Sequence, residues 1–590
     1  MEIYISLQNE VVDIFSLLSR DIDLLPFMAK YQSCLLSLKT HIAAEKNQTM
    51  QESYFFILTI LYKLIAYTRD IYGGLGERKL SYMMLFLWNY QFPLPAAHCL
   101  KNMVMPIQKY PPYGSWRDIK GMCLFIREFS EKGENDPFIE TCLGLMNHQL
   151  DVDYTLWNNT MDEYERKKNA GFATEKPTPQ SAGISMVAKW IPRECSSFGW
   201  LFKRATIQWI RSFKPHYFKS CKSESQFESA LKKGSKEYRQ VFSSLSKELD
   251  VLEIKQCKKE WKSIEPANIP FSALLRQNRS LLNISSNGGV RKTTASIHDR
   301  VSCAVKIQQH WRATRSTNTL GKTLTSHHTA FIDMGGFIQN ALRVLHPEEV
   351  MRMETQWRHI LSQSRVFPFS HVLPIVDLSL FRDQENRFYE AIGLACIIAM
   401  KSSKRILFFD QTTHFVSIEH CTSLKDILHL IRPIYYEHHI GQNFKAVCDT
   451  LLLSICETKL HEEHVKNMKL VFFTYYDRID MIQEIVQEAF ENAGFVHSPF
   501  LLVWRAAKKI PIHSSFIQNK PRTFVFSGNS NYTLYLFSLI GCDEWNDMNA
   551  FDLIAKLLDT RRYDIFENYF RQVFQQDSDV QKLERKLLNL

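Results

Sequence analysis

The chain is poor in the residues that interrupt regular structure, with 21 glycines and 20 prolines among 590 residues. These counts exclude collagen-like and linker-rich proteins, and they favour helices, whose interiors tolerate glycine and proline least. The 13 cysteines are dispersed, and no two form a Cys-x-x-Cys pair. Such a set predicts reduced thiols in a cytosol-like compartment rather than a disulfide framework or a zinc finger.

Long apolar runs are also missing. The longest, at about residues 391–400, has half of the roughly 20 residues that a membrane-spanning helix needs. The first residues place Glu2, Glu10 and Asp13 where a secretory signal would carry basic residues ahead of an apolar run. We therefore expect a soluble, cytoplasmic protein that makes no membrane contact.

The positive charge is concentrated in one segment. The chain has a net charge of +10, and residues 201–300 contain 20 Lys+Arg against 9 Asp+Glu, so the remainder is close to neutral. A localised basic field attracts a polyanion, and aromatic rings among the basic residues can stack on bases. The alternative is a solvated helical surface whose rings face the core, since their spacing is nearly helical. The rings concerned are Trp200, Phe202, Trp209, Phe213, Tyr217 and Phe218.

Two sequence patterns follow one another along the chain. Up to about residue 365, apolar residues recur at helical spacing, first in 3–20, 31–44, 53–68, 78–90 and 94–108. From residue 370, short β-branched or aromatic runs alternate with helical periods, which predicts a doubly wound α/β domain. The expected strands are 372–377, 405–409, 414–418, 469–474, 500–504 and 523–526; the expected helices are 388–400, 443–457, 481–493 and 531–540.

Several segments resemble a poorly characterised protein family. Thr68–Lys79, with the sequence TRDIYGGLGERK, resembles the family signature RDIRGGKGER, and further matches follow in the family's order over about 400 residues. They are Tyr113–Asp118, Ala188–Arg193, Lys236–Arg239 followed by Glu253, Trp261 and Pro270, and Gly441–Val447. Members occur in plants, fungi and large DNA viruses, and they join a TROVE-like helical region to a von Willebrand A domain.

The resemblance implies a multidomain α + α/β architecture. An N-terminal helical-repeat (TROVE/HEAT-like) region would span residues 1–365, with a flexible insertion at 282–300. A Rossmann-like von Willebrand A domain would occupy 366–540, and a helical tail 541–590. The Ro ribonucleoprotein is a more distant relative of this family, and in it a ring of helical repeats binds small structured RNAs and misfolded RNA ends.

RNA binding is accordingly the function that the resemblance implies, and the basic segment supplies the candidate phosphate contacts. These candidates are Lys203, Arg204, Arg211, Lys214, Lys219, Lys232, Lys233, Lys236, Arg239, Lys255, Lys258 and Lys259. The alternative is a protein–protein scaffold, a virion component among the options, that docks through the von Willebrand A-like domain. No complete catalytic pattern stands out, so we expect no enzyme.

The metal site of the family is degenerate here. Metal-binding von Willebrand A domains carry Asp-x-Ser-x-Ser, a later Thr and a later Asp, whose oxygens suit Mg²⁺. The chain keeps Asp377 and Ser379 but has Phe381, Gln442 and Tyr475 at the other three positions. Asp383 or Asp477 could substitute by a shift in register. We expect no bound metal ion and predict that Asp377 accepts hydrogen bonds from local backbone amides instead.

Three further motifs have structural interpretations. Gly73–Gly76 lacks the Walker pattern and predicts a helix–helix turn, with Arg69, Asp70, Glu77 and Arg78 forming a salt-bridge set around it. Ala304–Arg312 resembles an IQ motif, so Ile307–Arg312 could bind a calmodulin-like partner, pack on the helical region or touch nucleic acid. His461 and His464 lack the spacing of a catalytic zinc site and are expected in a solvated turn.

Overall fold

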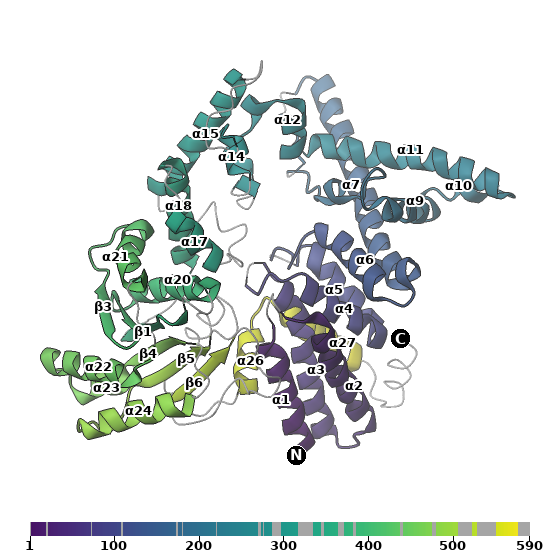
Figure 1. The fold of residues 1–590 in the computed structure, drawn as a ribbon. Helices are drawn as coiled ribbons and strands as arrows, with labels where there is room; N and C mark the ends of the chain where they lie inside the picture. The colour runs from purple at the N-terminus through teal and green to yellow at the C-terminus, as the bar shows by residue number, and fades with distance from the viewer. Residues whose placement is uncertain are drawn as a thin grey trace. The chain divides into compact units, whose positions relative to one another are not determined.

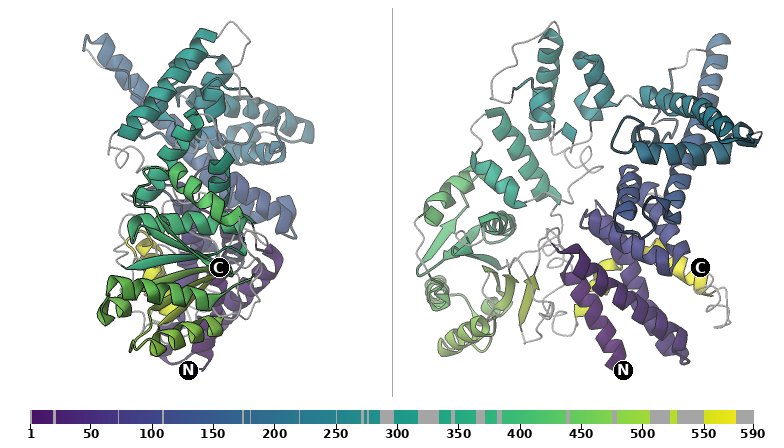
Figure 2. Two further views of the ribbon diagram at one scale, coloured as in Figure 1. Left: turned by 60° about the vertical axis from the view of Figure 1, so that its left-hand side comes forward. Right: turned by 45° about the vertical axis from the view of Figure 1, so that its right-hand side comes forward.

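Where the computed structural model describes the chain, it consists of helices and one sheet (Figures 1 and 2). It describes residues 2–18, 22–71, 73–107, 110–172, 175–179, 181–219, 221–249, 251–269, 273–274, 277–285, 297–316, 334–343, 347–363, 371–380, 385–436, 441–474, 479–505, 522–527 and 550–575. The chain divides into two compact units. The first contains Met1–Tyr67, Ile71–Leu75 and Trp311–Tyr569, and the second contains Thr68–Asp70, Gly76–His310 and Phe570–Leu590.

Over the described residues, the sheet of the first unit has six strands in the order β3-β2-β1-β4-β5-β6. All neighbouring strands are parallel except β2 and β3, which pair antiparallel at one edge. The strand order reverses between β1 and β4, which is where open α/β sheets bind ligands. The strands are β1 (Val372–Asp377), β2 (Arg405–Phe409), β3 (Thr413–Ser417), β4 (Lys469–Thr474), β5 (Phe500–Arg505) and β6 (Thr523–Ser527). The predicted strands and their alternation with helices are confirmed.

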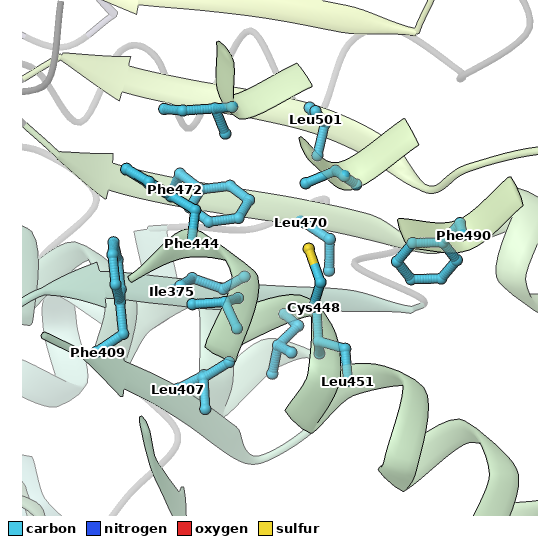
Figure 3. Packing of buried hydrophobic residues seen from close by; sticks show 14 of the residues in the cluster. Ile375, Leu407, Phe409, Phe444, Cys448, Leu451, Leu470, Phe472, Phe490 and Leu501 are labelled. Atoms are coloured by element: carbon cyan, nitrogen blue, oxygen red, sulfur yellow. The ribbon is translucent and has the colours of Figure 1, made fainter. Parts of the chain in front are cut away.

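Helices cover the sheet and bury its apolar runs. On one face, Ile375, Leu407 and Phe472 pack against Phe444 and Cys448 (Figure 3). These two residues belong to α22 (Phe444–Thr458), which packs beside α24 (Ile479–Asn492). The helix α20 (Glu385–Lys401) also packs on β1. Strands buried in this way are continuous apolar runs in sequence, which is why the short β-branched or aromatic runs predicted them.

Two helices that precede the sheet in sequence pack onto its covering helices. The helix α17 (Met334–Arg343) lies against α20, where a Cβ at Gly393 would stand 2.5 Å from Met334 Cγ, so only glycine permits this approach. In α18 (Pro347–Gln363), the buried Glu354 carboxylate accepts hydrogen bonds from the backbone N–H groups of Leu424 and Lys425, at 3.1 and 3.0 Å. It thereby satisfies two free donors at the start of α21 (Leu424–Tyr436).

The first unit also joins N-terminal and C-terminal helices. Phe566 packs edge-on against Tyr62, and the Lys63 ammonium lies 2.9 Å from a Glu567 oxygen. The helices concerned are α1 (Glu2–Ser16), α2 (Leu24–Ala44), α3 (Gln48–Arg69), α26 (Ala550–Leu558) and α27 (Asp564–Gln575). The predicted domain boundaries at residues 365 and 540 do not coincide with the limits of the two units, and they stay a prediction.

The second unit is helical. Its longer helices are α4 (Lys79–Gln91), α5 (Pro93–Val104), α6 (Arg117–Phe129), α7 (Pro137–Asn169), α9 (Gly199–Phe213), α11 (Glu224–Glu248) and the greater part of α15 (Ile297–Ser316). Short helices include α8 (Val187–Trp190), α10 (His216–Lys219) and α12 (Leu252–Lys258). The long helix α7 packs on both α9 and α11. The five helices predicted within residues 1–108 are confirmed.

Some predictions lie outside the described residues. They concern the helix at 531–540, most of the insertion at 282–300, the end of the tail, and the side chains of Phe381, Asp383, Tyr475 and Asp477. Among the described residues, none of the helices combines the length and apolar character that crossing a membrane requires.

Candidate functional site

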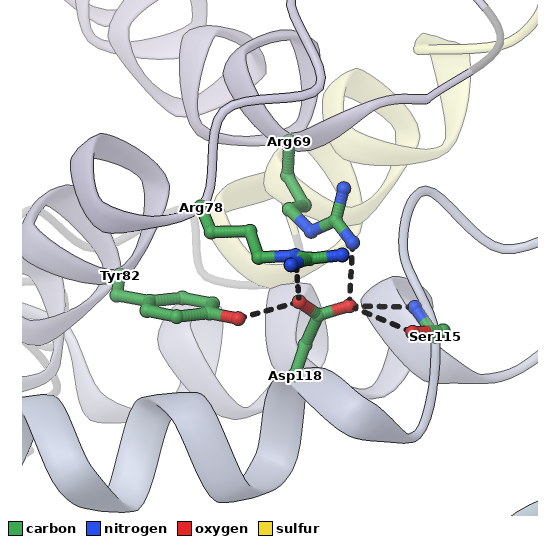
Figure 4. Close-up of polar contacts among 5 residues, drawn as sticks. All are labelled: Arg69, Arg78, Tyr82, Ser115 and Asp118. Atoms are coloured by element: carbon green, nitrogen blue, oxygen red, sulfur yellow. Dashed lines mark hydrogen bonds and ion pairs between the residues drawn. The ribbon is translucent and has the colours of Figure 1, made fainter. Parts of the chain in front are cut away.

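A buried carboxylate joins two of the sequence segments that resemble the family. Asp118 lies in the first turn of α6 and is fully buried, and its oxygens accept hydrogen bonds from Arg69 Nη2 at 2.7 Å and Tyr82 Oη at 2.5 Å (Figure 4). Ser115 adds its backbone N–H at 2.7 Å, and Arg78 Nε lies 3.6 Å away. The arginines of the Thr68–Lys79 segment therefore pair with Asp118, which the sequence analysis had not selected as their partner.

The electrostatics of this cluster favour the charged pair. Burial alone would raise the pKa of Asp118, but the Arg69 charge and the hydrogen bonds from Arg69 and Tyr82 hold it below its ordinary value. Burial and the neighbouring carboxylate raise the pKa of Tyr82 well above its ordinary value, so Tyr82 stays a donor. A Cβ at Gly114 would come within 2.5 Å of Asp118 Oδ2, so the glycine of the Tyr113–Asp118 segment makes room for the pair.

Other segments of the resemblance also meet in the second unit. The Lys189 ammonium lies 3.0 and 3.2 Å from the two oxygens of Glu253, and Arg239 Nη1 lies 2.5 Å from a Glu194 oxygen. Tyr238 Oη donates to Asn147 Oδ1 at 2.7 Å inside the core. Segments far apart in sequence thus contact one another, which spacing alone could not have predicted.

One face of α6 carries cations over aromatic rings. Arg117 Cζ and Lys120 Nζ lie 5.8 and 5.2 Å from the centre of the Trp190 ring. Lys120 is also 5.2 Å from the Phe198 ring. Farther along α6, Arg127 lies 5.0 Å from the Trp200 ring. Sequence analysis did not select this group; the signal for it was the i, i+3, i+10 spacing of the three cations.

The twelve candidate phosphate contacts fall into two groups. Four are engaged inside the unit: Arg204 with Glu140, Lys214 with Glu237, Arg239 with Glu194, and Lys255 with the Ser263 carbonyl. The other eight are exposed, and within the described part of the chain none of them forms an ion pair. They are Lys203, Arg211, Lys219, Lys232, Lys233, Lys236, Lys258 and Lys259.

Most of the exposed cations of the two long helices lie opposite their buried faces. In α11, Gly234, Tyr238 and Val241 point into the core, and Lys232 and Lys236 lie about half a turn away. In α9, Arg211 lies about half a turn from the centre of the buried face, whereas Lys203 lies at the edge of that face. Phe202 and Trp209 are buried, so for these two rings the core interpretation is confirmed.

A second candidate site lies at the switch point of the sheet. Asp377 ends β1 and is fully buried. One carboxylate oxygen accepts from the Ser379 N–H at 3.0 Å and from the Ser379 hydroxyl; the other accepts from Gln442 Nε2 at 2.5 Å and Thr474 Oγ1 at 2.7 Å. Gln442 Nε2 also lies 3.1 Å from Ser379 Oγ. Burial raises the pKa of Asp377, and the hydrogen bonds from Ser379, Thr474 and Gln442 oppose this shift.

These residues do not fit a divalent ion. The amide nitrogen of Gln442 lies within hydrogen-bond distance of both Asp377 and Ser379, the two residues that the resemblance matches to oxygen ligands. An amide N–H is a donor and cannot coordinate a cation, whereas Mg²⁺ requires oxygen ligands around it. Sequence analysis predicted backbone donors for Asp377; three of the four donors are side-chain groups, contributed by Ser379, Thr474 and Gln442.

The remaining motifs have internal contacts. In α15, Ile307 is fully buried and Lys306 pairs with Glu265, so this helix packs within the second unit. His461 and His464 are exposed, as predicted, but they belong to a helix rather than a turn, because His461 is the N-cap of α23 (Glu462–Asn467) and His464 lies within it. Within the described ranges, no group of three or more His, Cys, Asp or Glu side chains could hold a metal ion.

Comparisons with known proteins add no assignment. A scan against family models finds no match, and no curated protein and no solved structure matches the chain. The TROVE-like and von Willebrand A-like assignments therefore rest on the sequence segments quoted above.

Proposed function

We propose that this protein is a non-enzymatic RNA-binding scaffold, with a TROVE-like helical region and a von Willebrand A-like α/β domain. The observation that carries the proposal is the set of eight exposed cations on α9 to α12 that have no acidic partner within the described residues. Unpaired cations on the outer faces of packed helices repel one another. A polyanion that binds there relieves the repulsion and releases its own counterions.

The paired cations of the same helices support this interpretation. Arg204, Lys214 and Arg239 form ion pairs within the unit, so they are committed to structure. The exposed group contributes no comparable ion pair among the described residues. A surface that served only the fold would not need so many unpaired charges of one sign, and phosphate contacts are the use that such charges serve in nucleic-acid binding.

The test is binding of a structured and a single-stranded RNA across a salt series. We expect a sub-micromolar dissociation constant. The logarithm of the association constant should fall linearly with the logarithm of the salt concentration. Reversing Lys232, Lys233 and Lys236 to Glu should weaken binding by at least about tenfold. The charge reversal should also make the slope of this salt dependence shallower, by roughly 0.7–0.9 for each phosphate group that the variant no longer neutralises.

A matched control reverses Arg166, Lys167 and Lys168, three exposed cations at the end of α7, and so changes the net charge equally. Equal weakening by both triple variants would assign the effect to total charge and contradict a binding face on α11. Weak binding by the wild-type protein that no variant changes would overturn RNA binding and leave a protein scaffold as the working function.

A further inference from the structure

The cation–aromatic face of α6 is built from a regular spacing. Lys120 and Arg127 are seven residues apart and so lie on one side of the helix, with Arg117 one turn before Lys120. Leu124 lies between them on the same side and is exposed. At a rise of 1.5 Å per residue, the three cations span about 15 Å. The facing rings come from a single segment, residues 190–200, so one helix supplies the cations and one segment supplies the rings.

Lys120 is the cation of this face without a counter-charge. It is half-buried, and among the described residues no carboxylate pairs with it. Burial lowers the pKa of Lys120, and the charges of Arg193 and Arg117 lower it further. Three acidic groups of the unit already have cationic partners, because Asp118 pairs with Arg69, Glu253 with Lys189 and Glu194 with Arg239.

Arg193 completes the arrangement. It is exposed, its guanidinium stacks 4.3 Å from the centre of the Phe242 ring, and its hydrogen bond to the Ala188 carbonyl is long, at 3.5 Å. Lys120 and Arg193 therefore contact aromatic rings rather than carboxylates. Among the described residues, no ion pair neutralises their positive charges. An anion that enters their field gains from both positive charges.

We propose that Lys120 and Arg193, with the rings of Trp190 and Phe198, form a subsite for one phosphate and an adjacent unpaired base of a single-stranded RNA. This inference rests on the proposed function and assigns it a second contact region, separate from the exposed cations of α9 and α11. The two half-buried rings favour a single strand because only an unstacked base can place its face against an aromatic side chain.

The experiment compares full-length variants in binding to an oligouridine of about 10 nucleotides and to a duplex RNA of the same length. Lys120→Gln removes the charge and keeps a polar side chain; Lys168→Gln removes one exposed charge at the end of α7 as the control. Trp190→Leu keeps apolar bulk and removes the ring. Lys120→Arg restores the charge, and circular dichroism checks that each variant is folded.

We expect Lys120→Gln to weaken oligouridine binding by about fivefold or more and to lower the salt slope by about 1, with Lys120→Arg close to wild type. Trp190→Leu should weaken oligouridine binding at least about fivefold while changing duplex binding far less. If Lys120→Gln and Trp190→Leu behave like Lys168→Gln while the α11 charge reversal still weakens binding, the subsite is wrong and the proposed function stands. If the wild-type protein binds neither RNA, the proposed function fails and the subsite fails with it.

Discussion

Two buried aspartates, one in each unit, are compensated by different means. Asp118 in the helical unit faces the guanidinium groups of Arg69 and Arg78, whereas Asp377 at the sheet edge faces only the neutral donors of Ser379, Gln442 and Thr474. The pKa of Asp118 is lowered and that of Asp377 is raised, although both side chains are fully buried. Burial therefore does not decide the protonation of a carboxylate; the charge of its donors does.

The two buried aspartates also have different structural roles. The ion pairs of Asp118 link α3, α4 and α6 through full charges. Removing one partner therefore leaves the other buried in the core without its counter-charge. The Asp377 network consists of dipoles, and each donor contributes a modest net free energy. We expect the first cluster to dominate the stability of the helical unit and the second to fix the local geometry of the loops at the end of β1.

The largest effect should follow from breaking the ion pair on one side. Arg69→Met leaves the Asp118 carboxylate buried without its main cation, and should lower the free energy of unfolding by about 3–5 kcal/mol in urea denaturation of the full chain. The double variant Arg69→Met with Asp118→Asn removes both charges and should recover part of this loss. No recovery in the double variant would contradict an electrostatic origin.

A smaller effect should follow at the sheet edge. Gln442→Ala removes a neutral donor and should cost about 1–2 kcal/mol. The wild-type melting temperature should not respond to Mg²⁺, Mn²⁺ or a chelator, because donors already occupy the Asp377 oxygens. Gln442→Glu places a carboxylate against Asp377, and its lower melting temperature should rise when Mn²⁺ is added. A wild-type response to Mg²⁺ that Asp377→Asn abolishes would refute the donor network.

The two aspartates should respond to acid with opposite signs. The folded-state pKa of Asp118 lies below the ordinary 3.8, so its stabilisation is complete at neutral pH and is lost only as the pH falls below about 4. The folded-state pKa of Asp377 lies above 3.8, so its contribution to stability grows as the pH falls from neutral towards about 4. Melting temperatures of wild type, Asp118→Asn and Asp377→Asn from about pH 3 to pH 7 test both signs; equal slopes in all three would disprove the difference.

The smallest effect should come from an exposed ion pair in the same helical unit. Arg239 and Glu194 are 2.5 Å apart but largely exposed, so solvent screens the pair. Arg239→Gln should change the free energy of unfolding by at most about 1 kcal/mol, and added salt should shrink the difference further. If Arg239→Gln lowered the free energy of unfolding as much as Arg69→Met does, burial would not explain the difference in stability between the two arginine ion pairs.

Much of the fold could be predicted from local patterns, because apolar periodicity reports which face of each element is buried. It located the helices of residues 1–108 and the helices at 385–401, 444–458 and 479–492, and short β-branched or aromatic runs located the six described strands. It could not show that Glu354 would cap α21, or that Phe566 would pack on Tyr62, because these contacts join segments far apart in sequence.

For the candidate sites, the sequence by itself determined the residue types: the excess of cations in 201–300, the presence of Asp377 and Ser379, and Gln442 and Phe381 at positions where the resemblance implies further metal ligands. Only the tertiary structure decided their partners. It paired Arg69 with Asp118, brought Lys120 to Trp190 and Phe198, and placed the Gln442 amide between Asp377 and Ser379. The physical reason is that charges and donors act over a few ångströms in space, whatever their separation along the chain.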